Sequence, residues 1–63
     1  MENRIRELRK AAGLRQEDLA RLLGATRQTI HAIENNKYDP TLSLAFRLAR
    51  ELEITVDTLF VHP

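Results

Sequence analysis

Residues 27–35 contain Arg, Gln, Thr, His and Asn, side chains that can hydrogen-bond to base edges and phosphates. A helix that is merely exposed to solvent usually shows salt-bridging pairs of Glu and Lys instead. In a helix, Ile30 and Ile33 would define the buried side, which places Gln28, His31, Ala32 and Asn35 opposite, at i, i+3, i+4 and i+7. Arginine fits guanine O6 and N7, glutamine fits adenine N6 and N7, and a small alanine can approach a thymine methyl. The pattern predicts a helix that reads bases in the major groove of DNA. The alternative is a polar surface that has no partner.

The connection before this segment is unusually short. Only Gly24, Ala25 and Thr26 separate Leu23 from Arg27. Three residues join two short helices at a steep angle, as in a helix-turn-helix. We therefore expect a helix-turn-helix at about residues 16–35, with Thr26 as the N-cap of its second helix.

Three further helices are expected around this pair. Asn3 can cap a first helix that ends before Gly13 and buries one apolar stripe: Ile5, Leu8, Ala11 and Ala12. Leu14 is expected to enter the core from the connection that follows. The second helix, about residues 16–23, is predicted to turn four residues inward: Leu19, Ala20, Leu22 and Leu23.

Residues 35–40, with two Asn and a Pro, predict a loop. Thr41 then caps a fourth helix, about residues 42–52, that buries Leu44, Ala45, Leu48, Ala49 and Leu52. A short fifth helix starts at Thr55 and ends near Phe60. The expected fold class is all-α: a compact bundle of five short helices forming one domain over residues 1–63.

The composition bounds the function. The chain has 63 residues, no cysteine, and a formal net charge of +1. Residues 1–38 carry eight Lys or Arg and five Asp or Glu, whereas residues 39–63 carry two and four, so a basic half (+3) precedes an acidic half (−2). We expect one surface for a polyanion, although chance could also scatter the charge this way. The sequence opens into charged residues rather than an apolar run, so no signal peptide is expected, and no stretch approaches the ~20 apolar residues of a membrane span. Both observations predict a cytoplasmic protein.

Catalysis is not expected. The histidines are His31, on the proposed DNA-binding side, and His62, beside the last residue, and no cysteine could act as nucleophile or thiolate ligand. We therefore expect no enzyme, no cofactor, no metal site and no small-molecule ligand.

Several separate blocks carry a resemblance: IRELR at 5–9, LRQEDLA at 14–20, GATRQTI at 24–30, IENNKYDP at 33–40, and the segment from Leu42 onward. Together they resemble the Cro/C1-type helix-turn-helix family, also called the Xre family. The resemblance implies a lambda-repressor-like fold with a core of about residues 5–59. It also implies a transcriptional regulator, more specifically a repressor.

The resemblance also implies residue roles. Gln16 is similar to the family glutamine that binds a DNA phosphate and reaches toward the recognition helix. Arg27 and Gln28 match the base-reading positions, and the flanking positions are Thr26, Thr29, His31 and Ala32. Asn35, Lys37 and Tyr38 match the phosphate-gripping loop. Glu34 matches a glutamate that forms a structural ion pair with an arginine of the first helix, here Arg9.

Two positions depart from the family pattern. Arg15 stands where Ser or Asn is usual, which weakens the helix cap but adds a cation that could meet phosphate. Asn36 stands where Gly is common, and it tolerates a positive φ. His31 could make a pH-sensitive contact or a plain neutral hydrogen bond.

Two partner hypotheses remain. The chain could be an antitoxin-like or anti-repressor protein-interaction module of the same fold, but the hydrophilic surface at 27–35 favours DNA, because protein-binding grooves need apolar anchors. One recognition helix covers few base pairs, so a homodimer is also expected. Its predicted interface is the fourth–fifth helix region, with Val56, Leu59, Phe60 and Val61.

Overall fold

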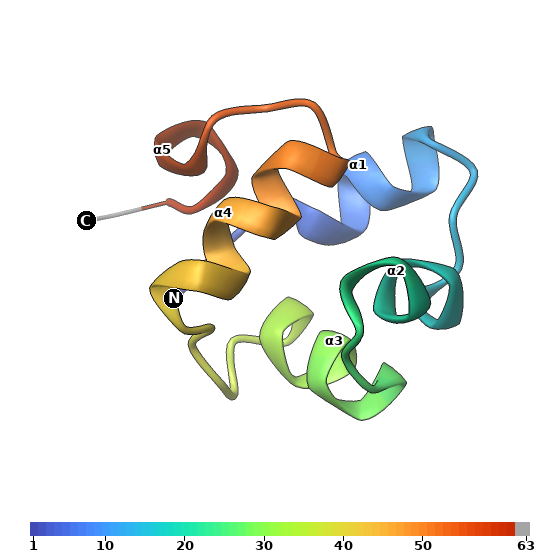
Figure 1. Cartoon of the computed structure of the whole chain (residues 1–63). Helices are drawn as coiled ribbons and strands as arrows, with labels where there is room; N and C mark the ends of the chain where they lie inside the picture. The colour runs from blue at the N-terminus through green and yellow to red at the C-terminus, as the bar shows by residue number, and fades with distance from the viewer. Residues whose placement is uncertain (62–63) are drawn as a thin grey trace.

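The computed structural model describes residues 1–61. Five helices follow one another (Figure 1): α1 Ile5–Ala11, α2 Gln16–Leu23, α3 Arg27–Glu34, α4 Leu42–Glu51 and α5 Val56–Leu59. This order confirms the predicted all-α bundle. Within residues 1–61, no helix has the length and apolar character needed to cross a membrane.

The four longer helices end alike, with one residue in the left-handed region after the last turn. These residues are Gly13 (φ 74°), Gly24 (φ 66°), Asn36 (φ 61°) and Glu53 (φ 55°). In each case the next residue donates its N–H back to the last turn of the helix, for example Leu14 to the Arg9 carbonyl at 3.0 Å. This Schellman arrangement satisfies carbonyls that the helix end would leave free. Each helix therefore stops sharply, and the connections stay short.

The N-termini of α3 and α4 are capped by threonine hydroxyls, as predicted. Thr26 Oγ1 accepts from the Thr29 N–H at 3.1 Å, and Thr41 Oγ1 accepts from the Leu44 N–H at 3.2 Å. Losing such a cap typically costs about 1 kcal/mol. The Thr26 cap matters for function because it sets where α3 begins.

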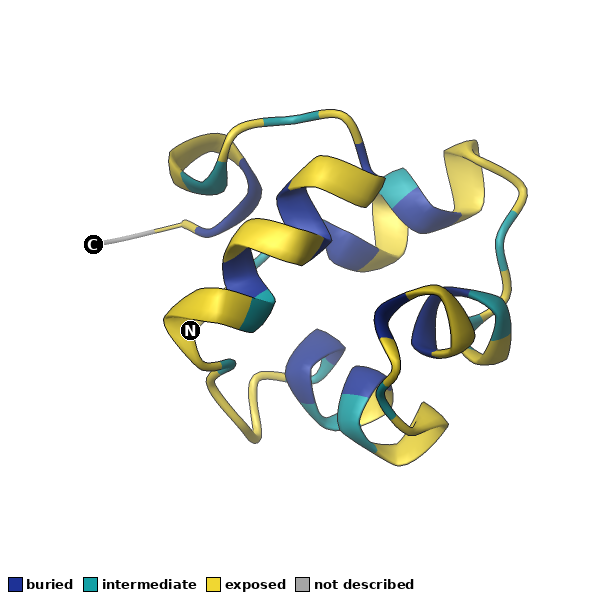
Figure 2. Ribbon diagram, viewed as in Figure 1, coloured by how far each residue is buried: buried dark blue, intermediate teal, exposed yellow. Residues whose placement is uncertain are grey.

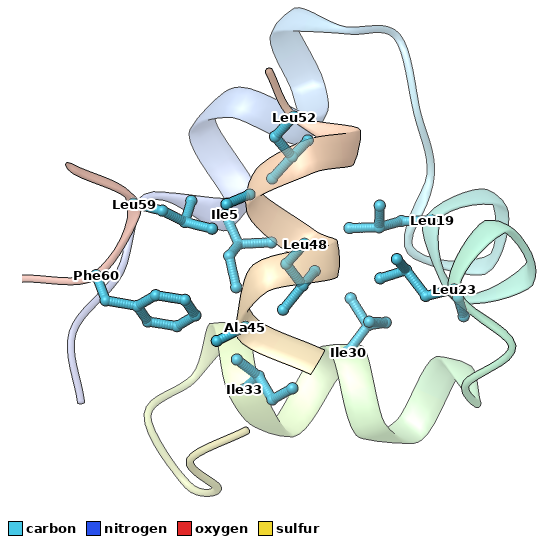
Figure 3. Packing of buried hydrophobic residues seen from close by; sticks show 12 residues of the cluster. Ile5, Leu19, Leu23, Ile30, Ile33, Ala45, Leu48, Leu52, Leu59 and Phe60 are labelled. Atoms are coloured by element: carbon cyan, nitrogen blue, oxygen red, sulfur yellow. The ribbon is translucent and has the colours of Figure 1, made fainter. Parts of the chain in front are cut away.

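Leu48 of α4 lies at the centre of the core (Figure 3), and its side chain is fully buried. Side chains from all five helices surround it. The buried apolar residues are Ile5, Leu19, Ala20, Leu23, Ile30, Ile33, Ala45, Leu48, Ala49, Leu52, Leu59 and Phe60. Leu14 packs against this cluster from the α1–α2 connection, as expected.

Three inward predictions are wrong. Leu22 is 52% exposed, and Ala11 and Ala12 are exposed as well. At 100° per residue, Leu22 points roughly 100° away from the centre of the stripe formed by Leu19, Ala20 and Leu23. Both alanines lie at the end of α1, where its last turn extends beyond the neighbouring helices (Figure 2).

The predicted dimer interface also needs correction. Leu59 is fully buried and Phe60 is only 6% exposed, so both belong to the core of one chain and have little or no surface left for a partner. The segment before α1 holds them there: the Arg4 N–H donates to the Leu59 carbonyl at 2.9 Å, and Asn3 forms a β-bridge with Phe60. Apolar pattern alone could not distinguish a fifth helix that completes the core from one that covers a partner.

Candidate nucleic-acid interface

The helix pair α2–α3 forms the predicted motif. The two helices pack against each other across the three-residue connection. Ile30 and Ile33 anchor α3 in the core, whereas Arg27, Gln28 and His31 are exposed along its other side (Figure 2). One polar face of a short helix is thus exposed, while its other face is packed in the core.

The predicted contact residues differ in exposure. Those that reach solvent freely are Arg15, Thr26, Arg27, Gln28, His31, Lys37 and Tyr38. Those that are half-buried are Gln16, Thr29, Ala32 and Asn35. Arg27, Gln28 and His31 together line one hollow on the surface of α3. Arg27 and Gln28, which the resemblance matches to base-reading positions, therefore lie next to each other on one exposed surface.

A buried carboxylate, Glu34, lies at the C-terminal end of α3, on the side that contacts α1. Glu34 Oε2 accepts from Arg9 Nε at 2.7 Å, and Glu34 Oε1 accepts from the Arg9 guanidinium at 3.2 Å. The Glu34 side chain is fully enclosed, and that of Arg9 is only 9% exposed. Arg9 also donates to the Leu14 carbonyl at 2.9 Å. The pair therefore ties the end of α3 to α1 and to the α1–α2 connection.

The pKa of Glu34 reflects two opposing effects. Burial raises it, but hydrogen bonds from Arg9, Gln16 and Arg6, together with the positive charge of Arg9, outweigh burial. The net result is a pKa below the ordinary value of 4.5. Glu34 is therefore ionised at neutral pH and acts as the acceptor of the whole cluster.

Gln16 joins this cluster to the exposed surface. Its Nε2 donates to Glu34 Oε1 at 3.1 Å and lies 3.4 Å from His31 Nδ1. The first residue of α2 is thus linked to both the hidden and the exposed side of α3. This geometry suits a residue that helps to position α3.

Sequence reasoning missed Arg6. Its guanidinium donates to Asn35 Oδ1 at 3.0 Å and to Glu34 Oε1 at 3.4 Å. Asn35 in turn donates through Nδ2 to the His31 carbonyl at 2.8 Å. The polar groups of Asn35 are therefore engaged at the end of α3. The spacing of Arg6 and Arg9, one turn apart on α1, was the available signal.

Arg15 is engaged as well. Its Nε and terminal nitrogen contact the Asp18 carboxylate at 3.0 and 3.1 Å, and its backbone N–H donates to the same carboxylate at 2.9 Å. The Arg15 hydrogen bonds hold the pKa of Asp18 at about 2, and Asp18 raises the pKa of Arg15. Asp18 thus supplies the cap that Arg15 cannot, and it forms an exposed ion pair with the added cation.

A steep helix pair whose second helix exposes hydrogen-bonding side chains is the arrangement of helix-turn-helix DNA-binding proteins. A family model described as "Helix-turn-helix" (HTH_3) matches residues 5–59. The chain therefore belongs to the Cro/C1-type (Xre) helix-turn-helix family of DNA-binding transcriptional regulators, as the resemblance implied, and is no enzyme.

Curated relatives match this sequence along nearly its whole length. An uncharacterized HTH-type transcriptional regulator of Methanocaldococcus jannaschii is 45% identical over 62 residues, covering 98% of this chain and 94% of that protein. Another such regulator, of Bacillus subtilis, is 38% identical over 60 residues, covering 95% and 91%.

Solved structures share the fold. The restriction-modification controller protein C.AhdI of Aeromonas hydrophila superposes with a TM-score of 0.82 at 40% identity, covering 90% of this chain and 86% of that one. SinR, a master regulator for biofilm formation crystallised in complex with DNA, gives a TM-score of 0.79 at 27% identity, covering 87% and 89%.

Proposed function

We propose that this chain is a cytoplasmic repressor that binds a specific duplex operator as a homodimer. α3 enters the major groove, and bound protein blocks RNA polymerase at an overlapping promoter. The observation that carries the proposal is the exposed face of α3, where Arg27, Gln28 and His31 share one hollow above a buried Arg9–Glu34 anchor.

Recognition divides into two kinds of contact. Arg27 and Gln28 are assigned to base edges, with Thr26, Thr29, His31 and Ala32 at the flanks of the same surface. Gln16, Lys37 and Tyr38 are assigned to the DNA backbone on either side of α3, and contacts of this kind set register and orientation. Asn35 remains a predicted backbone contact. Its engaged side chain (its Nδ2 donates to the His31 carbonyl) leaves it mainly the role of holding the end of α3 in place.

The test is a selection of duplexes from a randomised library with purified protein, repeated at two salt concentrations. A recovered motif with two-fold symmetry is the expected result. Salt weakens backbone contacts, so the motif should persist while total binding falls. Unselective binding, or none at low salt, would instead favour the protein-interaction module.

The proposed dimer interface uses apolar residues that are exposed to solvent in a single chain. Leu42 is 69% exposed and Phe46 is 56% exposed, and they lie one turn apart on α4. Val56 lines an apolar hollow beside each of them. We call Leu42, Phe46 and Val56 the α4–α5 patch. The exposed Val61 is kept from the earlier expectation.

Two-fold symmetry suits this patch, because the same surface of each copy would cover the other. Two recognition helices would then meet half-sites about 34 Å apart, one turn of DNA. The sequence signal for the α4–α5 patch was the pair Leu42 and Phe46, two apolar residues four positions apart that lie outside the buried stripe of α4.

Replacing Phe46 with glutamate is expected to shift the chain toward monomer, with self-association at least tenfold weaker, because a charge would be buried in the interface. Sedimentation equilibrium over a concentration series measures this. Leu22→Glu is the matched control, since Leu22 is similarly exposed (52%) but lies on α2. Equal association of the two variants, or a monomeric wild type even on DNA, would remove the patch as the interface.

A further inference from the structure

A basic hollow opens beside the recognition surface, between the end of α1 and the starts of α2 and α3. It brings four cationic residues and one acidic residue together from three helices and a connection. Its lining consists of Arg9, Lys10, Gly13, Leu14, Arg15, Gln16, Glu17 and Arg27. The hollow is continuous with the DNA-reading surface, because Arg27 also lines the hollow on α3.

The four cations are not equally available. Arg9 is bound to the buried Glu34, and Arg15 is bound through two guanidinium nitrogens to Asp18. Lys10 and Arg27 are exposed and form no ion pair within residues 1–61. Glu17, the acidic residue of the lining, opposes an anion there. The positive charge offered to a ligand therefore comes from Lys10 and Arg27.

We propose that Lys10 of α1, a residue outside the helix-turn-helix, binds a DNA phosphate in this hollow, and that Arg15 does not. The proposal rests on the proposed function, since the ligand is the backbone of the bound operator. A lysine ammonium is a point charge on a flexible stem, so an unpaired Lys10 can follow a phosphate without losing another partner. Arg15 would first have to leave Asp18. The binding surface thus extends from α2 and α3 onto α1.

The salt dependence of operator binding tests this allocation. Each lysine–phosphate contact adds about 0.9 to the slope of log affinity against log salt. Lys10→Ala is expected to lower the slope by that amount, so that over a fourfold rise in salt the wild type loses roughly 3.5-fold more affinity than the variant. Arg15→Ala should leave the slope unchanged. Arg47→Ala is the matched control, because Arg47 is an exposed cation of α4 outside the hollow.

A variant that is expected to add a phosphate contact gives a second, independent test of the same proposal. Asp18→Asn should release Arg15 and steepen the slope by up to about one unit. A Lys10→Ala slope equal to that of Arg47→Ala would overturn the proposal, and so would a loss in Arg15→Ala as large as in Lys10→Ala. Either result leaves the proposed function standing if the wild type binds its selected duplex. A wild type that binds no duplex would remove both.

Discussion

Replacing Glu34 with alanine is expected to lower the free energy of unfolding by about 3–5 kcal/mol. The variant would leave the Arg9 guanidinium buried without its counter-ion, since the Arg9 side chain is only 9% exposed. Gln16 and Arg6 would lose their shared acceptor, Glu34 Oε1, at the same time. For a small chain this is a large part of the total stability. Chemical denaturation followed by circular dichroism measures the change.

Two further variants identify the cause of that loss. Glu51→Ala is the matched control, because Glu51 is exposed at the end of α4, and a change within about 0.5 kcal/mol is expected. The double variant Arg9→Met/Glu34→Leu should recover most of the stability, since apolar residues can replace a buried ion pair. A double variant as unstable as Glu34→Ala would show that the lost hydrogen bonds from Gln16 and Arg6, and not the stranded charge of Arg9, dominate the effect.

The contribution of Glu34 to stability should also appear in how the free energy of unfolding depends on pH. The folded-state pKa of Glu34 lies below its ordinary 4.5, so its contribution is present above 4.5 and is lost as pH falls through the folded value. Asp18 acts with the same sign between 3.8 and about 2. Stability should thus be flat from pH 7 to about 5 and then fall, and Glu34→Ala should remove the upper part of that fall.

Replacing Gln28 with alanine is expected to weaken binding of the selected operator by roughly 10- to 100-fold, corresponding to about 1–3 kcal/mol of base discrimination. Gln28 is exposed at the start of α3 and shares its hollow with Arg27 and His31. Binding to unrelated duplex should change little, because backbone contacts supply it. Fluorescence anisotropy with operator and scrambled duplexes measures both affinities.

Lys37→Ala is the counterpart of that variant. Lys37 is exposed after α3 and pairs with no acid within residues 1–61. Its loss should weaken binding to both duplexes alike and reduce the salt slope by about one unit. If Gln28→Ala also weakened both duplexes equally, Gln28 would be a backbone contact, and base reading would rest with Arg27.

The sequence by itself determined the helices, most of their ends and the class of protein; α1 is an exception, because Arg4 and not the expected Asn3 is its N-cap. Thr26 and Thr41 cap their helices as predicted, and Asn36 has the positive φ that it was expected to tolerate. Gly13 and Gly24, which lie just after their helices, also have a positive φ. These are local effects of a hydroxyl or of backbone freedom, so neighbouring residues suffice to predict them. Glu53 adopts the same conformation (φ 55°) without such a local preference; the next residue, Ile54, packs against the core and donates its N–H to the Ala49 carbonyl.

Only the tertiary structure decided which side chains are free. Leu59 and Phe60 look like Leu42 and Phe46 in a sequence, yet the first two close the core and the last two remain exposed. Cationic residues likewise differ in whether they form an ion pair. Arg15 is bound to Asp18, whereas Lys10 lines the basic hollow and has no ion-pair partner within residues 1–61. Burial and ion pairing depend on which helices meet, and that information is not contained in the residue types alone.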